Sequence, residues 1–78
     1  MKTNDKRFKK GRIEVCRKVW FRDNTILPEK VVEYWVRYKN RNGRIGWHTE
    51  TYKRRGYAMQ LGQDWAAVIG CDCTQVTV

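Results

Sequence analysis

Four side chains of the kinds that bind zinc are scattered along the chain: Cys16, His48, Cys71 and Cys73. Cys71 and Cys73 are two residues apart, so on a strand both sulfur atoms would point to one face. The spacing of the four residues is not that of a zinc knuckle or ribbon, and an odd number of cysteines is not typical of a disulfide framework. We therefore expect buried, inert thiols, no metal site and no cofactor.

The residue patterns of known catalytic sites are missing from this sequence. The chain has a single His, no clustered pair of carboxylates and no Gly-rich phosphate loop. We therefore expect no enzymatic activity and no catalytic residue.

Basic residues are numerous and unevenly distributed. The 78 residues include 17 Lys and Arg against 8 Asp and Glu, for a formal net charge of +9. Every Lys and Arg lies at or before Arg55, whereas the stretch from Gly56 to Val78 carries only the charges of Asp64 and Asp72. A protein of this charge favours polyanions, chiefly nucleic acid. We expect one basic side and one neutral to acidic side.

The expected site binds nucleic acid, DNA rather than RNA, and centres on the stretch 33–47. Cations there would contact phosphates, which gives affinity without sequence selectivity. Trp35 among them offers a ring for stacking on a base or under Arg side chains; shielding by its basic neighbours, with no ligand, is the simpler alternative. The candidate residues are Trp35, Arg37, Lys39, Arg41, Arg44, Lys53, Arg54, Arg55, Lys9 and Lys10.

Three of these candidates, Lys53, Arg54 and Arg55, are expected in the first turn of a helix with Thr51 as its N-cap. Cations are unfavourable beside the positive end of a helix dipole. The cluster is therefore either a phosphate site formed together with the free N–H groups of the helix start or a solvated basic turn.

The elements that would position the basic residues begin with a β-hairpin. Strand side chains alternate between two faces, so one face is apolar and the other carries Trp35, the basic residues and His48. The pair Asn42-Gly43 predicts a two-residue type I′ turn. This turn pairs Tyr38 with Trp47. The apolar face then consists of Val32, Tyr34, Val36, Tyr38, Ile45 and Trp47.

A second register fits the same turn. Residues 40–43 also match a three-residue loop with Gly43 in the left-handed conformation. It would pair Lys39 with Ile45 and Arg37 with Trp47, which moves Trp47 to the basic face because one residue of slip exchanges the faces. We favour the first register because it keeps the apolar residues together.

The remaining pattern predicts an α+β fold, a four-stranded, mostly antiparallel sheet with one helix packed on one face. A first strand spans 12–21, a second begins near Val31, and a last one covers 71–78 parallel to the first. The expected spatial order of the strands is third, second, first, last. Gly70 ends the helix, and Gly62 suggests close approach to the sheet. The apolar stripe of the helix is Ala58, Leu61, Gly62, Trp65, Val68 and Ile69.

Residues 1–11 are expected to form a flexible basic arm, because they carry several cations and a single apolar ring, Phe8. Residues 12–78 would form one α+β domain. No apolar run approaches the roughly 20 residues of a membrane span, and no signal peptide is recognisable. With the odd cysteine count, these features favour the cytoplasm, and no membrane partner.

The run Tyr34-Trp35-Val36-Arg37-Tyr38-Lys39-Asn40-Arg41-Asn42-Gly43-Arg44, followed by Lys53-Arg54-Arg55, Ala58 and an amphipathic helix, resembles the arm-type DNA-binding domain at the N-terminus of phage integrases. The resemblance reaches from Tyr34 to about Ala67. It implies a sheet packed on a helix and laid in the major groove of DNA, with Arg37, Lys39, Arg41 and Arg44 facing the groove. The strand expected at 71–78 has no counterpart in that family.

In size, Trp content and element order the chain is also similar to small phage accessory proteins that bind and inhibit host machinery. This analogy implies a phage or mobile-element origin and an interface with a host protein, anchored by Trp35, Trp20 and Tyr57. The two hypotheses differ in salt dependence. Binding to nucleic acid falls steeply with salt, whereas a protein interface survives moderate salt.

Overall fold

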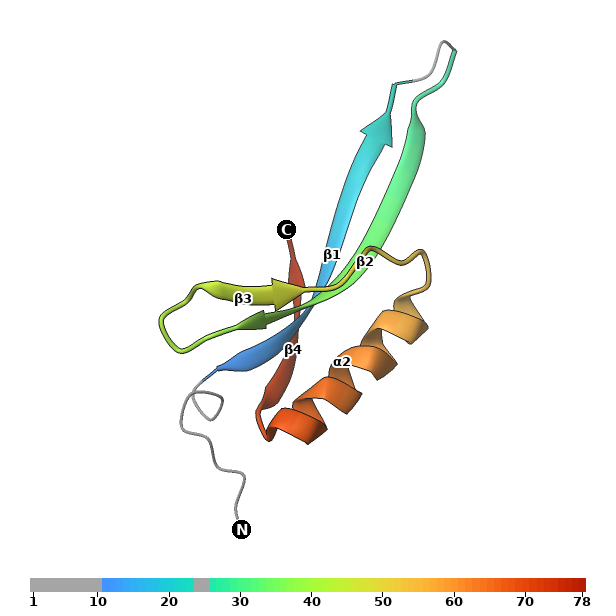
Figure 1. Ribbon diagram of the computed structural model, residues 1–78. Helices are drawn as coiled ribbons and strands as arrows, with labels where there is room; N and C mark the ends of the chain where they lie inside the picture. The colour runs from blue at the N-terminus through green and yellow to red at the C-terminus, as the bar shows by residue number, and fades with distance from the viewer. Residues whose placement is uncertain (1–10, 24–25) are drawn as a thin grey trace.

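The computed structural model describes residues 11–23 and 26–78, which form one four-stranded sheet and one helix (Figure 1). The strands lie in the order β3-β2-β1-β4 across the sheet. The β1–β2 and β2–β3 pairs are antiparallel, and β4 is parallel to β1, so the predicted α+β fold and strand order are confirmed. The expected flexible arm lies, except for Gly11, outside the described residues. The elements are β1 (Arg12–Arg22), β2 (Glu29–Lys39), β3 (Ile45–His48), α2 (Arg55–Ile69) and β4 (Asp72–Thr77).

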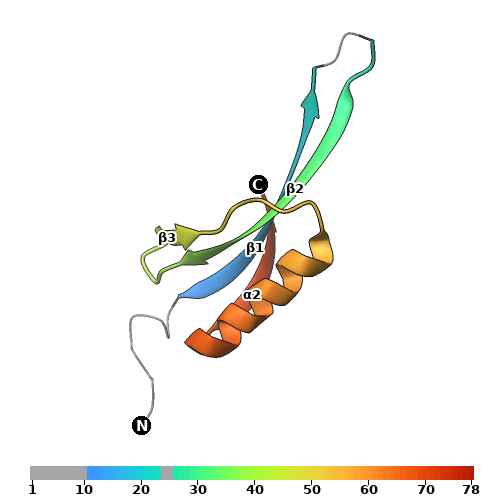
Figure 2. The same cartoon turned by 45° about the vertical axis from the view of Figure 1, so that its right-hand side comes forward.

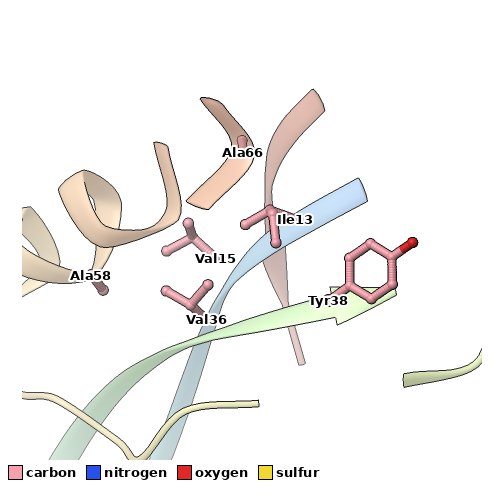
Figure 3. Packing of buried hydrophobic residues seen from close by; sticks show 6 residues of the cluster. All are labelled: Ile13, Val15, Val36, Tyr38, Ala58 and Ala66. Carbon is pink, nitrogen blue, oxygen red and sulfur yellow. The ribbon is translucent and has the colours of Figure 1, made fainter. Parts of the chain in front are cut away.

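Helix α2 packs on one face of the sheet through a stripe of small residues. Its buried positions are Ala58, Gly62 and Ala66, which recur every four residues and so share one side of the helix. A Cβ atom on Gly62 would lie 2.5 Å from Cγ2 of Val15, so only glycine allows this approach, as predicted. The buried hydrophobic cluster consists of Ile13, Val15, Val36, Tyr38, Ala58 and Ala66 (Figure 3).

The predicted apolar stripe of the helix is wrong at its margin. Val68 is 74% exposed and Trp65 is 41% exposed. Because the helix approaches the sheet so closely, bulky side chains cannot fit beneath it and lie at its sides. Trp65 instead contacts Trp47 with ring centroids 5.0 Å apart, and Trp47 stacks in turn on Tyr38.

The two ends of α2 differ in how well the sequence predicted them. Gly70 adopts a left-handed conformation with φ 83° and ends the helix, as predicted. The predicted N-cap is wrong, because Arg54 occupies that position and forms no side-chain cap bond. Thr51 lies in an extended segment whose next residue, Tyr52, pairs with Tyr34 through backbone hydrogen bonds. This pairing holds the chain extended past Thr51 and delays the helix.

Near its turn, the β2–β3 hairpin follows the three-residue register. Lys39 pairs with Ile45, and the N–H of Asn40 donates to the carbonyl oxygen of Arg44 at 2.8 Å. Gly43 has φ 83°, whereas none of the described residues other than glycines has a positive φ. The predicted type I′ turn is therefore wrong, since it requires a positive φ at Asn42 as well.

Farther from the turn, the hairpin follows the favoured two-residue register. Tyr38 pairs with Trp47, and the N–H of Thr49 donates to the carbonyl oxygen of Val36 at 2.9 Å. The ladder shifts by one residue in between, so Gly46 is the extra residue of a β-bulge. The predicted position of Trp47 on the apolar face is confirmed. The predicted position of Ile45 on that face is wrong, because Ile45 pairs with Lys39 across the bulge and shares the face of Lys39.

The strands β1 and β2 continue beyond the rest of the sheet as a two-stranded ribbon (Figures 1 and 2). β4 pairs with β1 only as far as Arg17, and Tyr34 is the β2 residue bridged to Tyr52. We call residues 18–33 the ribbon arm. The helix does not cover the arm, so its outer apolar residues lie in solvent: Phe21 is 63%, Ile26 88% and Leu27 73% exposed.

Candidate nucleic-acid interface

One face of the sheet carries α2, and the opposite face is covered by no helix or strand among residues 11–23 and 26–78 (Figure 2). We call this the helix-free face. Strand alternation and the observed registers place on it Arg12, Glu14, Cys16, Lys18, Trp20 and Arg22 from β1, Glu29, Val31, Glu33, Trp35, Arg37 and Lys39 from β2, Ile45 and His48 from β3, and Asp72, Thr74 and Val76 from β4. Trp35 and His48 therefore lie on the face predicted for them.

A buried carboxylate lies at the centre of the helix-free face. Glu14 is 1% exposed. Its Oε1 accepts a hydrogen bond of 2.7 Å from Nε of Arg37, and its Oε2 accepts one of 3.0 Å from Nε of Arg12. We call these three residues the Glu14 cluster. Its two ion pairs fix the guanidinium groups in place and partly neutralise them.

Two opposing effects act on the pKa of Glu14. Burial alone would raise the pKa, because it removes the charged form from water. Hydrogen bonds from Arg37 and Arg12, with the positive charge of Arg37 and Lys39, outweigh burial and hold the pKa below its ordinary value. Glu14 therefore stays ionised at the centre of the helix-free face.

Two exposed cations, Arg41 and Arg44, and the partly buried Lys39 lie at the β2–β3 turn. Lys39, Arg41 and Arg44, which we call the turn cluster, form no ion pair with any residue that the structure describes. The turn itself is braced, because Oδ1 of Asn40 accepts hydrogen bonds from the backbone N–H groups of Asn42 and Arg44 at 2.9 and 3.1 Å. The cluster therefore presents three available charges on a structured loop.

The helix-start candidates are separated from the turn cluster. Tyr52, next to Lys53, pairs with Tyr34, which is five residues, or about 16 Å, along β2 from Lys39. This exceeds the screening length of roughly 8 Å at physiological salt, so the two groups act as separate charges. Only Arg55 of the helix-start candidates lies within the helix, and it donates to Oε1 of Gln75 at 3.1 Å.

Trp35 is half-buried beside Arg37 and opposite Cys16 on β1. Cys16 is fully buried, and burial raises the pKa of its thiol, as expected for an inert thiol. Cys71 and Cys73 are partly buried, and burial raises the pKa of each. Within the part of the chain that the structure describes, no group of three or more His, Cys, Asp or Glu side chains could hold a metal ion.

A groove of about 370 Å³ lies between the ribbon arm and residues 51–53. Its walls include Trp20, whose Nε1 donates to Oε1 of Glu33 at 2.8 Å, and the ion pair of Arg22 with Glu29 at 3.3 Å. Charges of both signs line the groove. It therefore offers no selective attraction for phosphate.

The structure thus brings Arg37, Lys39, Arg41 and Arg44 to one end of the sheet. It places Trp35 on the same face but farther along β2, opposite Cys16, and the helix-start candidates elsewhere. Lys9 and Lys10 lie outside the described residues. Sequence reasoning missed Arg12 and Glu14 as part of this surface. A signal was present, because an acidic residue alternates with cations on the polar side of the first strand, but its partner Arg37 is 23 residues away.

No helix among the described residues is long and apolar enough to cross a membrane. Comparisons with protein-family models, curated proteins and solved structures find no match for this chain.

Proposed function

We propose that this protein binds nucleic acid, DNA in preference to RNA, without strong sequence selectivity, through the turn cluster and the adjoining part of the helix-free face. The observation that carries the proposal is the turn cluster itself: Lys39, Arg41 and Arg44 lie at a structured turn, and none forms an ion pair with a described acidic group. Phosphate contacts from such residues release counterions and favour any polyanion.

The Glu14 cluster gives Arg37 a different role from the one predicted. Arg37 is mostly buried, and its Nε is bonded to Glu14. The remaining N–H donors of its guanidinium are held at a fixed position, on the same face of β2 as Trp35. In the proposal, Arg37 and Trp35 orient a bound strand, whereas the turn cluster supplies most of the attraction.

The test is fluorescence anisotropy of labelled duplex DNA, single-stranded DNA and RNA over a series of salt concentrations. The variant Lys39→Gln/Arg41→Gln/Arg44→Gln removes three charges without touching the Glu14 cluster. We expect at least tenfold weaker binding, and a log-log salt slope that falls by about 2 to 3 units for three lost phosphate contacts.

The matched control is Lys18→Gln/Lys30→Gln/Lys53→Gln, which removes the same number of charges from three separate places. Net charge is then equal in the two variants, so only position differs. Equal losses in both variants would show that total charge, rather than the turn cluster, drives binding and would refute the assignment of the site.

The ribbon arm favours a second candidate function, binding to another protein. Residues 18–33 carry three basic and three acidic side chains, so the arm has no net attraction for phosphate. Its exposed Phe21, Ile26 and Leu27 are typical of a protein contact. A more specific version of this second candidate function is that the bound protein is a host protein, which the chain inhibits.

Weak binding to all three nucleic acids, indifferent to salt, would favour the second candidate. The variant Phe21→Ser/Ile26→Ser/Leu27→Ser would then be compared with the unaltered protein as bait. A partner retained by both would contradict a role for the arm.

A further inference from the structure

The two edges of the sheet differ in their protection against pairing with another strand. β3 has four residues, a bulge, and basic residues at or beside both ends, Arg44 and His48. These are common devices that blunt an edge. β4 has six residues with no Pro, Gly, Lys or Arg, and its register with β1 runs without a shift. β4 is therefore an open, regular edge.

The backbone groups on the outer side of β4 can be identified. The N–H of Val78 donates to the carbonyl oxygen of Arg17 on β1 at 2.9 Å. Backbone polar groups of successive strand residues point in alternate directions, so Val76 and Thr74 also face β1, whereas Cys73, Gln75 and Thr77 face outward. The outward groups have no hydrogen-bond partner in the part of the chain that the structure describes.

We propose that two copies of the chain associate through their β4 strands, paired antiparallel about a two-fold axis at Gln75. Gln75 then pairs with Gln75 of the second copy, and Cys73 pairs with Thr77 on each side of the axis. Each of these three pairs exchanges two hydrogen bonds, so the pairing satisfies all the outward groups of β4. The interface is self-complementary, as a two-fold dimer requires.

Charge favours a second copy as the occupant of this edge. A chain of net charge +9 repels itself over most of its surface. The stretch from Gly56 to Val78, which includes most of α2 and all of β4, contains no Lys or Arg. β4 itself therefore brings no cation to a contact with a like-charged copy.

Two cations lie close to the proposed axis: Arg17 on β1, which pairs with Thr77, and Arg55 on α2, and both line a small hollow with Gln75. Arg55 donates to Oε1 of Gln75, so pairing would bring the two copies of Arg55 near each other. Salt screens this repulsion, and we expect association to strengthen as salt rises. Binding of nucleic acid has the opposite salt dependence, so the two properties can be separated, and the dimer does not depend on the proposed function.

The first test uses the unaltered protein under reducing conditions, without nucleic acid. Sedimentation velocity gives the mass over a concentration series, and NMR hydrogen exchange follows individual amides. We expect a monomer–dimer equilibrium in which the amides of Cys73, Gln75 and Thr77 gain protection with concentration. The amides of Thr74 and Val76, which face β1, should be protected throughout. A monomer at every concentration, with rapid exchange at the three outward amides, would overturn the proposal.

The second test compares Gln75→Pro with Gln75→Ala. Proline removes an outward N–H at the axis but no hydrogen bond to β1, a position where strands tolerate it; alanine removes the side chain and keeps the N–H. We expect a monomeric Pro variant and a dimeric Ala variant. A dimer that persists in a folded Gln75→Pro variant would place the interface elsewhere and refute the proposal. If circular dichroism shows that this variant is unfolded, the exchange pattern of the unaltered protein decides.

Discussion

The two faces of β1 exclude water by different means. On the side of α2, Ile13 and Val15 are covered by the small-residue stripe of the helix. On the helix-free face, Glu14 is buried to the same degree, although no helix or strand in the described ranges covers it. There the long side chains of Arg12 and Arg37 form the cover. A bare sheet face can thus hold a buried residue when neighbouring guanidinium groups both cover and neutralise it.

The two faces should also differ in how strongly amino-acid substitutions affect stability. Apolar burial is non-directional and contributes roughly 25 cal/mol per Å², so the covered face tolerates changes that keep shape and volume. A buried ion pair depends on both partners, because its Coulomb energy and hydrogen bonds offset a desolvation cost of several kcal/mol per ion. The helix-free face should therefore be the more sensitive to a single polar change.

The largest effect should follow from Glu14→Ala. Removal of the carboxylate leaves Arg12 and Arg37 without their shared partner and opens a gap at the centre of the face. We expect a loss of about 2 to 4 kcal/mol of unfolding free energy, near the lower end for broken buried pairs because Arg12 is half-exposed. Urea denaturation provides the measurement.

A matched control is Glu29→Ala, which removes a carboxylate from the exposed pair with Arg22. Exposed pairs contribute at most about 1 kcal/mol. Similar losses in the two variants would mean that burial adds nothing at Glu14.

As pH falls, the contribution of the helix-free face to the free energy of unfolding should decrease before that of the covered face. The folded-state pKa of Glu14 lies below its ordinary value of 4.5, so between these two pKa values the unfolded chain binds more protons than the folded one. The stability that Glu14 contributes is complete above the ordinary value and is lost as pH falls through the folded-state pKa. The loss should be smaller than in Glu14→Ala, because a protonated carboxyl still forms hydrogen bonds. Urea titrations at decreasing pH would measure it, and Glu14→Ala should lack this part of the pH dependence.

The smallest effects concern the covered face and have opposite signs at two glycines of the same helix. Gly62→Ala places a methyl group against Val15, and we expect a net loss of about 1 kcal/mol, since overpacking exceeds the gain in helix propensity. Gly56→Ala meets no atom within 4 Å and should stabilise by up to about 1 kcal/mol. Thermal unfolding would compare them. Stabilisation by both would mean that α2 can move away from the sheet at little cost.

The features that were predictable from sequence are those encoded by local periodicity. Alternation along the strands and the helical spacing around Gly62 predicted the element order, the strand order and the close helix contact. The start of α2 was not predictable in this way, because it depends on the pairing of Tyr52 with Tyr34. The hairpin bulge was not predicted for a related reason. Each of the two registers fits part of the β2–β3 ladder, and the extra residue Gly46 allows both to occur in one hairpin.

The sequence predicted which basic residues belong to the candidate site, but not how they are arranged on the sheet. The basic residues of the hairpin were identified from composition and turn chemistry. Their division into a neutralised Arg37 and an available turn cluster follows from cross-strand register, which pairs Glu14 with Arg37. Register is set by turn geometry together with the apolar pattern of both strands, and no turn type was predicted for the connection between β1 and β2.

The parallel pairing of β4 with β1 also constrains the order in which the sheet assembles. Arg22 pairs with Glu29 across a short connection, whereas Arg12 pairs with Asp72 near the other end of the chain. Loop closure of the second pair costs roughly 2 kcal/mol more entropy than closure of the first. Parallel, long-range ladders of this kind are intrinsically slow to form. We therefore expect the β4 edge to form after the β1–β2 ribbon, because β4 joins the sheet through its pairing with β1.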